Sequence, residues 1–514
     1  MANFIKVKSQ DNVVIPVQDV PAGTVVAAGV KTTVYIPQGH KIAAKNLKKG
    51  DKIIRYGVSL GNLLQDVPAG GRIDENMLEQ PEISDIDSIV WTPPANSSKS
   101  KAKRSFPKLS ANMPAASFDG YDLPGSKFAG TRNILCIMTT VQCVTGIVNA
   151  ALERIRSELL PKYPNVDDIT VINHSHGCGV AMNSRDSAIP TRTLKNMLRN
   201  PNFGGEIMLV ALGCEMLTLD MLLPSKEINS KNVIVLQTLS GFGAMLETIY
   251  SMAEKKLQKL NQRKRVTLPL EKLCIGMQCG GSDAFSGVTA NPAAGYASDL
   301  IIKAGGTVLF SETTEARDGV EYLSNRCANR ELSQKLKEEM KWYDAYLKQG
   351  GSGIDANPSP GNKAGGLVNI TEKTMGAIAK SGCAPITGIL SPGEKVSSKG
   401  LIFASTPACD FVCGPLQLAS GITLQVFTTG RGTPYGLAAA PVIKVSSRTE
   451  LKNLWNDLID IDAGTIAEKK ETINQVGKRI YKLIIETASG RYKPYAEKYR
   501  LFNDICLFIP SPLT

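Results

Sequence analysis

The stretch NILCIMTTVQCVTGIVNAALERIRSELL at residues 133–160 decides the fold class. It opens with a mostly apolar run, which is typical of a strand buried on both faces of a parallel sheet. After a short polar break, apolar residues recur every three or four positions up to residue 160, as in an amphipathic helix. A second apolar run follows at residues 169–173. A strand, a helix and a second strand in this order predict a βαβ unit and therefore a mainly parallel sheet.

The same alternation continues toward the C-terminus. Further strands are predicted at residues 207–212, 233–237, 273–277, 307–311, 401–404 and 423–427. Helices are predicted at residues 145–160, 192–199, 244–260, 331–348 and 473–488. We expect an α/β fold with two α/β domains, at residues 118–262 and 263–514.

The first 90 residues have a different pattern. Short stretches of alternating apolar and polar residues are separated by Pro-Ala-Gly, Pro-Gln-Gly and Lys-Lys-Gly turns, which predicts a small all-β domain at residues 1–90. Residues 91–117 are rich in proline, serine, asparagine and lysine and have no periodicity, so we interpret them as a linker.

The composition is that of a folded chain. Its 514 residues are 43% hydrophobic and 21% charged, which excludes a disordered or fibrous protein. No apolar run approaches the roughly 20 residues that a membrane-spanning helix needs. The first residues also show no secretory signal. We therefore expect a cytoplasmic protein with no membrane partner.

The chain is basic, with a net charge of +12. Such a balance can indicate a nucleic acid or an anionic substrate as the partner. The basic clusters at residues 99–104 and 262–265 have no interleaved aromatic residues that could stack on bases. We expect no nucleic-acid partner.

Cysteines follow four of the predicted strands, at the carboxyl ends where open α/β sheets bind their ligands. The residues at these four ends are Cys143; His174, His176 and Cys178; Cys214 and Glu215; and Cys279, Ser282 and Asp283. A single cysteine at a strand end would indicate only a small residue that packs in the core. Four of them, beside two of the three histidines in the chain, make a metal or iron–sulfur site an equally good interpretation. No C-x-x-C pair is present among them, which disfavours a zinc ribbon.

Two glycine-rich loops offer backbone amides and cations to an anion. Residues 428–436 contain Thr429 and Arg431, whose guanidinium suits a carboxylate. Residues 357–366 contain Asn362 and Lys363. Both loops are also compatible with ordinary turns. The first has Pro and Tyr where a dinucleotide-binding helix would begin, so we exclude a nicotinamide cofactor.

Longer motifs surround these residues. They are PQGHKIA (37–43), HSHGCGVA (174–181), LGCE (212–215), GMQCGGSDAFSGVTANPAAGYASDL (276–300), NPSPGNKAGGL (357–367), TPACDFVCG (406–414) and VFTTGRGTPYGLAAAPVIK (426–444). On these motifs the sequence resembles the galactarate dehydratase/altronate dehydratase family of sugar-acid hydro-lyases. Residues 276–293 and 411–414 are most similar to its galactarate branch.

The resemblance implies a SAF-type N-terminal β domain, a homodimer, an iron(II) requirement and loss of water from a dianionic hexaric acid. Galactarate would give 5-dehydro-4-deoxy-D-glucarate. The expected metal ligands are His40, His174, Cys143, Cys178, Cys214 and Cys279. The expected proton-transfer residues are His40, His174, Glu215 and Asp283. The expected substrate-binding residues are Ser282, Asn362, Lys363, Thr429 and Arg431.

Two positions depart from the family pattern. His176 stands where the family usually has tyrosine, and residues 123–128 (LPGSKF) replace a segment that usually reads Asn-Ala-Asp-Gly. The loop change leaves altronate, or a sulfonated hydroxy acid cleaved by a related sulfo-lyase, as alternative substrates. A non-catalytic sugar-acid sensor is the alternative of a different class. An iron–sulfur cluster on Cys143, Cys178, Cys214 and Cys279 is the alternative to a single iron ion. Without the resemblance, the turn at residues 37–41 predicts that His40 lies on the surface.

Overall fold

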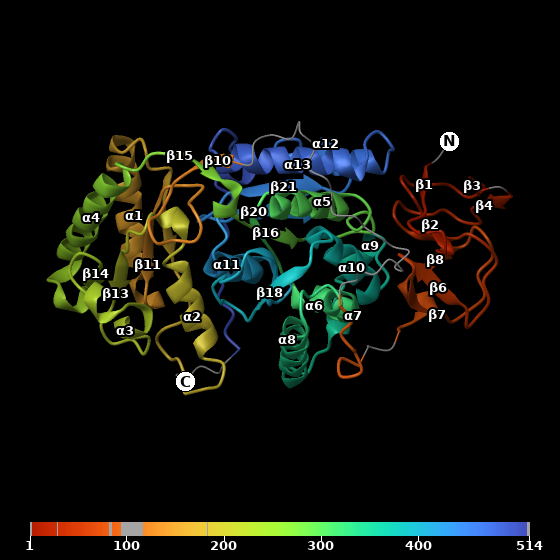
Figure 1. The fold of residues 1–514 in the computed structure, drawn as a ribbon, viewed down its shortest axis with the longest axis horizontal. Coiled ribbons are helices and arrows are strands. Elements are labelled where there is room, and N and C mark those ends of the chain that lie inside the picture. Colours follow the sequence, from red (N-terminus) through yellow and green to blue (C-terminus); the bar gives the residue numbers. More distant parts are fainter. Residues whose placement is uncertain (1–2, 28, 82–84, 94–116, 182, 511–514) are drawn as a thin grey trace.

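The structure is a computed structural model that describes residues 3–510 except 28, 82–84, 94–116 and 182. Most of the predicted linker and the basic cluster at residues 99–104 therefore lie outside the described residues. The small β domain and the second domain lie at opposite ends of the molecule, and the C-terminal domain lies between them (Figure 1). Within the described residues, no helix has both the length and the apolar character needed to cross a membrane.

The N-terminal domain consists of short antiparallel strands. Its strands are β1 (Phe4–Ile5), β2 (Val13–Pro16), β3 (Val25–Ala27), β4 (Val30–Lys31), β5 (Lys41–Ala43), β6 (Lys52–Arg55), β7 (Val58–Leu63), β8 (Arg72–Ile73) and β9 (Leu78–Glu79). They form small sheets in the orders β1-β2-β5-β8, β3-β4 and β6-β7-β9. Tight turns between the strands, many with glycine at positive φ, explain the dense turn signals in this part of the sequence.

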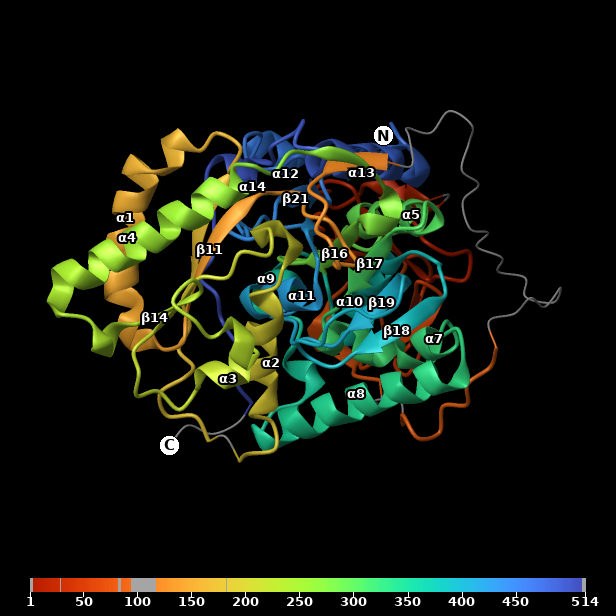
Figure 2. The same cartoon turned by 60° about the vertical axis from the view of Figure 1, so that its left-hand side comes forward.

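The second domain is built on a parallel sheet of order β12-β11-β13-β14. Its elements are β11 (Ile134–Thr139), α1 (Thr145–Glu158), β12 (Asp168–Ile172), α2 (Ala188–Met197), β13 (Leu209–Ala211), α3 (Leu219–Leu222), β14 (Val233–Val235) and α4 (Gly241–Leu260). Alternate residues of β11 contribute to opposite cores: Leu135 and Ile137 pack with α1 and α4, whereas Cys136 and Met138 pack with α2. Helices α1 and α4 lie side by side on the outer face of the sheet (Figure 2).

The C-terminal domain contains a seven-stranded parallel sheet of order β18-β19-β17-β16-β20-β21-β22. Its strands are β16 (Cys274–Cys279), β17 (Thr307–Phe310), β18 (Ile386–Leu390), β19 (Gly400–Ala404), β20 (Leu424–Thr429), β21 (Val442–Ser446) and β22 (Ile461–Asp462). Its helices are α5 (Ala290–Lys303), α6 (Thr313–Ala316), α7 (Val320–Ser324), α8 (Arg330–Gln349), α9 (Pro360–Ala364), α10 (Ile370–Ala377), α11 (Asp410–Ser420), α12 (Thr449–Leu454), α13 (Ile473–Ala488) and α14 (Tyr495–Lys498). An antiparallel ribbon of β10 (Ser117–Gly120) and β15 (Val266–Pro269) lies where the second and C-terminal domains join.

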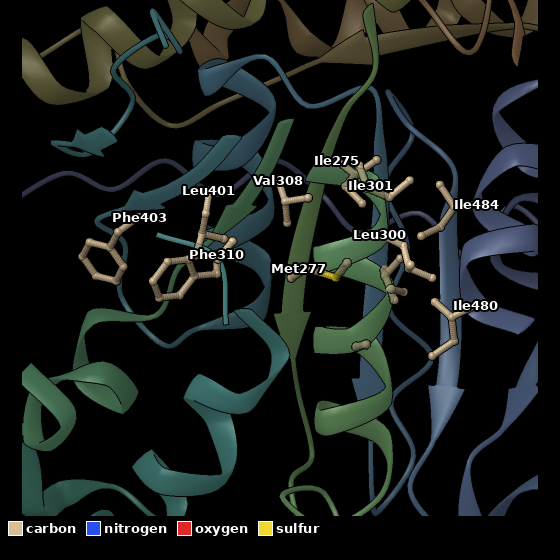
Figure 3. Close-up of a cluster of buried hydrophobic side chains, with 14 of the residues drawn as sticks. Ile275, Met277, Leu300, Ile301, Val308, Phe310, Leu401, Phe403, Ile480 and Ile484 are labelled. Carbon is tan, nitrogen blue, oxygen red and sulfur yellow. The ribbon is translucent and has the colours of Figure 1, made fainter. Parts of the chain in front are cut away.

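The main core lies between this sheet and two helices. Side chains of the central strands, such as Met277, Val308 and Phe310, form one buried cluster with Leu300 on α5 and Ile480 on α13 (Figure 3). Each fully buried side chain of this size contributes about 1.5–3 kcal/mol through removal of apolar surface from water. The opposite face of the sheet packs on α11, so central strands such as β16 are buried along their whole length. The predicted fold class, a small β domain followed by α/β domains, is confirmed.

Candidate active site

The carboxyl ends of the central C-terminal strands surround a cavity of about 430 Å³. Residues that follow β16, β17 and β19 line it, so it lies at the edge where parallel α/β sheets bind ligands. Its volume falls within the roughly 300–1,000 Å³ of small-molecule sites. The polar residues on its wall include Glu315, Asn357, Asn362, Lys373 and Asp410.

A buried ammonium group lies at the cavity wall. Lys373 on α10 forms an ion pair with Glu315, with 2.8 Å between the charged atoms. Its Nζ also donates to the side-chain oxygens of Asn357 at 2.8 Å and Asn362 at 3.1 Å. Burial alone would lower the pKa of Lys373, but Glu315 outweighs this effect and raises the pKa. Lys373 is therefore a permanent positive charge.

A second buried pair lies behind the first. Lys380 pairs with Glu312, which follows β17 and has a left-handed backbone with φ of 75°. Burial raises the pKa of Glu312 to about 8, although Lys380 opposes this change. A non-glycine residue in this conformation is strained, and such strain concentrates at functional sites.

Asp410 is a second carboxyl group on the cavity wall, besides Glu315. It is the first residue of α11, and Gln278 donates to its Oδ1 at 3.0 Å. Burial raises the pKa of Asp410 to about 6, since that single side-chain hydrogen bond and the nearby lysines compensate only in part. A carboxyl group with a pKa near neutrality can both accept and donate a proton.

Asp283, which follows β16, is held on all sides. Its Oδ1 accepts from the amides of Phe285 at 3.0 Å and Ser286 at 2.8 Å and from the Ser286 hydroxyl at 3.0 Å. The Ser447 hydroxyl donates to it at 2.9 Å, and Arg448 pairs with its Oδ2 at 3.0 Å. With its acceptor capacity filled in this way, Asp283 anchors the loop after β16.

Two glycine-rich turns lie against each other beside Asp283. The carbonyl of Gly281 accepts from the amides of Gly430 at 3.1 Å and Arg431 at 2.8 Å. A side chain at Gly430 would collide with the Asp283 carboxylate. Glycine here allows the loops after β16 and β20 to meet, which places Arg431 beside the loop that carries Ser282 and Asp283.

The N-terminal domain docks on this region through buried charges. Lys41 and Arg55 both pair with Glu372 on α10, at 2.7 and 2.9 Å. All three side chains are fully buried. Glu372 precedes Lys373, so consecutive residues of α10 contact the N-terminal domain and the cavity. Burial lowers the pKa of Lys41 to about 8 despite the attraction of Glu372.

His40 lies at the same interface. Its neighbour Gly39 packs against Ala284, Phe285 and the carbonyl of Gly365, and a side chain at Gly366 would approach the His40 amide. The His40 Nδ1 faces the Gln38 carbonyl at 3.4 Å, and burial lowers the pKa of the ring. His40 is therefore buried at a domain interface rather than free on a surface turn.

The second domain carries its own group of predicted site residues. His174 Nε2 lies 2.8 Å from the Thr139 carbonyl, and its Nδ1 is buried. Glu215 accepts from Thr140 and from the amides of Leu212 and Gly213. Burial alone would raise the pKa of Glu215, but these hydrogen bonds lower it. The thiols at the strand ends of this domain, all exposed, are those of Cys143, Cys178 and Cys214.

His176 is buried beside His174, with 6.3 Å between the ring centroids. Within the part of the chain that the structure describes, neither ring nitrogen of His176 has a hydrogen-bond partner. Burial, with a smaller effect of His174, lowers its pKa to about 4. The ring is neutral at physiological pH.

The predicted metal ligands do not converge. In the described part of the chain, no three His, Cys, Asp or Glu side chains are arranged to hold a metal ion. His40 belongs to the N-terminal domain, Cys279 to the C-terminal sheet, and the remaining four residues to the second domain. Cys279 is itself buried, with its Sγ 2.8 Å from the Ser282 hydroxyl.

Comparison with known sequences covers all three parts. Residues 2–81 match the altronate/galactarate dehydratase SAF domain, residues 120–261 the D-galactarate dehydratase/altronate hydrolase second domain, and residues 270–512 the D-galactarate/altronate dehydratase C-terminal domain. Galactarate dehydratase (L-threo-forming) of Escherichia coli K12 is 48% identical over 524 residues, covering all of this chain and 98% of the relative. This chain belongs to the galactarate/altronate dehydratase family.

Two other relatives are less similar in sequence, and one of them matches only part of this chain. Altronate dehydratase of Bacillus subtilis strain 168 is 34% identical over 96% of each chain. The beta subunit of (2R)-sulfolactate sulfo-lyase from Chromohalobacter salexigens is 29% identical over 47% of this chain and 62% of the subunit.

The predicted substrate-binding residues lie mainly around the C-terminal strand ends. Asn362 lines the cavity and donates to the Ser282 carbonyl at 2.8 Å. Thr429 accepts from the Gly432 amide at 3.0 Å and thus shapes the loop that carries Arg431. Lys363 follows Asn362 on α9 but is not among the residues that line the cavity. The roles of all these residues remain predictions.

The unusual loop at residues 123–128 lies far from this edge of the sheet. Lys127 donates to the Ser397 carbonyl at 2.7 Å, and Lys272 approaches the Ser126 carbonyl at 3.5 Å. Ser397 and Lys272 lie within three residues of the first residues of β19 and β16, so the loop lies at the amino ends of these strands. It cannot contact a molecule in the cavity at their carboxyl ends.

Sequence reasoning missed the charged residues of the cavity. Glu315 and Lys373 lie in short helices without a glycine loop or a cysteine to mark them. Asp410 lies within the motif TPACDFVCG, in the segment that follows the predicted strand at residues 401–404, and that position was the available signal. The pairing of Glu315 with Lys373 joins distant segments and could not be read from spacing.

Proposed function

We propose that this chain is a hydro-lyase that dehydrates galactarate to 5-dehydro-4-deoxy-D-glucarate. The observation that carries the proposal is the 48% identity to a galactarate dehydratase over the whole of this chain. The cavity supports it, because a buried cation, amides and a carboxyl group of raised pKa suit a polyhydroxylated dianion.

The reaction makes two demands on the protein. A weakly acidic hydrogen next to a carboxylate must be removed, and the neighbouring hydroxyl must leave as water. The negative charge that develops on the carboxylate must be stabilised by fixed donors. The C-terminal strand ends offer Lys373 and the surrounding amides for the second demand and Asp410 for the first.

We propose iron(II) as the cofactor, which would supply a Lewis acid for the substrate carboxylate and hydroxyl. The buried Nδ1 of His174 and the thiols of the second domain are suitable donors in type, but among the described residues they do not form a ligand set as they stand. Cys279 belongs to another sheet than Cys143, Cys178 and Cys214. An iron–sulfur cluster on these four cysteines is therefore kept only as the alternative to a single iron ion.

The cofactor proposal is tested by metal analysis. Wild-type protein purified without oxygen should retain iron(II), and His174→Ala or His40→Ala should lose it if that histidine is a ligand. Unchanged iron content and activity in both variants would contradict the assignment of either histidine. A broad visible absorption band would indicate a cluster instead of a single ion.

The substrate is tested by turnover. Galactarate, altronate and glucarate are incubated with the anaerobic protein, with and without iron(II), and the 2-keto-3-deoxy acid formed is measured. Product from galactarate alone supports the proposal, whereas product from altronate would replace it. No turnover of any of them by folded, iron-loaded protein would favour the sulfo-lyase or the non-catalytic sensor.

We also propose a cytoplasmic homodimer, as the family resemblance implies. Light scattering after size-exclusion chromatography measures the mass directly, and a mass of one chain would contradict the dimer.

A further inference from the structure

One positively charged side chain is found among the described residues that line the cavity. Among the described residues that line it, Lys373 is the only lysine or arginine. Its ammonium has three hydrogens, and three oxygens already accept them, those of Glu315, Asn357 and Asn362. The group is thus held at a defined position before any ligand arrives.

One of these three partners can give way to a substrate. Glu315 is the counter-ion, and Asn362 is fixed from both sides because its Nδ2 donates to the Ser282 carbonyl at 2.8 Å. Asn357 contributes only a neutral amide oxygen. A substrate carboxylate in its place would pair an ionised acceptor with the ionised donor, adding the attraction of opposite charges to the hydrogen bond.

The position of Lys373 is set by the N-terminal domain. The preceding residue, Glu372, is locked by Lys41 and Arg55, and its Oε2 accepts from the Val368 amide at 2.9 Å. Helix α10 therefore cannot rotate without breaking a buried ion triad. This rigidity orients a substrate with little loss of entropy on binding.

Asp410 faces the same space. Gln278 donates a hydrogen bond to it, and the charged groups that act on it include Glu312, Glu315, Lys373 and Lys380. A bound dianion would add negative charge next to this carboxyl group, and like charges favour its protonated form. The cavity thus combines a fixed cation for one end of the substrate with a carboxyl group able to exchange a proton.

We propose that Lys373 binds a carboxylate of the substrate in this cavity and that Asp410 is the catalytic acid–base residue. This inference rests on the proposed dehydratase function and names the residues that perform it.

The proton and electron movements balance with one carboxyl group. Ionised Asp410 takes the hydrogen from the carbon next to the carboxylate, and the electron pair of the C–H bond moves into that carboxylate to form an enediolate beside Lys373. The pair then forms the C=C bond as the neighbouring C–O bond breaks. Asp410 returns its proton to the leaving hydroxide, which departs as water, and the resulting enol tautomerises to the keto acid.

Four variants of the full-length, iron-loaded protein test the proposal. Lys373→Met should weaken galactarate binding about 100-fold or more by calorimetry and raise KM, while Lys373→Arg should restore part of the affinity. Asp410→Asn should bind galactarate normally but lose about 10²–10⁴-fold in kcat. In both kinetic series, a Lys335→Met, Asp457→Asn double variant at distant positions serves as the control for charge removal.

Two outcomes would overturn the inference. One is galactarate binding by Lys373→Met within threefold of wild type, and the other is a kcat of Asp410→Asn within threefold of wild type. Circular dichroism and the melting temperature establish that each variant is folded. Failure of wild-type protein to turn over galactarate would instead refute the proposed function, and the calorimetric comparison would still test Lys373.

Discussion

The strand ends of the second domain and those of the C-terminal domain use similar residues and create different environments. Both present cysteine and a carboxylate where parallel strands finish. In the second domain the three thiols are exposed, and Glu215 is held by Thr140 and backbone amides. In the C-terminal domain Cys279 is buried among lysine–glutamate pairs beside a cavity.

The difference arises from what covers each edge. The N-terminal domain and helices α9 and α10 pack over the C-terminal strand ends, so charges there are desolvated and must be paired. At the second domain, no element within the described residues buries the thiols. Burial converts ordinary polar residues into groups with shifted pKa values, and shifted pKa values are typical of catalytic sites.

The largest effect is expected where the C-terminal edge is covered. Glu372→Gln leaves Lys41 and Arg55 buried against a neutral amide, and breaking a buried pair from one side costs about 3–5 kcal/mol. Urea unfolding measures the loss. Glu271→Gln, which removes an exposed partner of Lys399, is the matched control and should leave the midpoint unchanged. Equal stability of the two variants would show that covering this edge does not depend on the ion triad.

An intermediate effect is expected from the pH dependence of stability. The pKa of Asp410 is raised by folding from 3.8 to about 6, so its ionisation opposes the folded state. This cost is absent below about pH 3.8, develops between pH 3.8 and 6, and is complete above pH 6. Asp410→Asn cannot ionise and should be more stable than wild type at pH 7.5 by about 1–3 kcal/mol.

The same pair of proteins should differ by only about a third as much at pH 4.5, because most of the cost develops between pH 4.5 and 6. The groups that act on Asp410 are Gln278, Glu312, Glu315, Lys373 and Lys380, and they are identical in both proteins. A stability difference that does not change between pH 4.5 and 7.5 would show that Asp410 is ionised without penalty in the folded protein.

A smaller effect is expected on the alkylation rates of the cysteines, which should differ between the strand ends of the second domain and those of the C-terminal domain. An alkylating reagent should modify Cys143, Cys178 and Cys214 in the folded protein about tenfold faster or more than Cys279, because reaction requires an accessible thiolate. Burial also raises the pKa of Cys279. Peptide mass spectrometry gives the rate at each position.

Adding iron(II) sharpens this comparison. If the exposed thiols are metal ligands, iron(II) should protect all three from alkylation, whereas magnesium should not. Protection of Cys279 alone would place the metal at the C-terminal edge.

The smallest effect is expected for Cys143→Ser. The side chain is exposed and its removal leaves no cavity, so the unfolding free energy should change by less than about 0.5 kcal/mol. A larger loss would mean that the thiol is bonded to a metal or a partner. Val144→Ala, at the buried neighbouring position, is the control for a real packing loss.

Elements with strong local signals were predicted well. The helix expected at residues 473–488 is α13, where buried residues recur every four positions and Thr472 and Gln475 form a capping box. Helix α5 was missed, because its glycine and proline argue against a helix. Gly295 is needed there since a side chain would collide with the Ala379 carbonyl, a contact with a distant segment.

The sequence by itself determined the α/β pattern, the small β domain, the family motifs and the placement of cysteines at strand ends. These features depend on local periodicity and on residues adjacent in the chain. Only the tertiary structure decided that Asp283 is an anchor, that His40 lies at a domain interface, and that Glu315, Lys373 and Asp410 share a cavity. The physical reason is that burial and charge pairing depend on which distant segments pack together, and these interactions set the chemistry of a side chain.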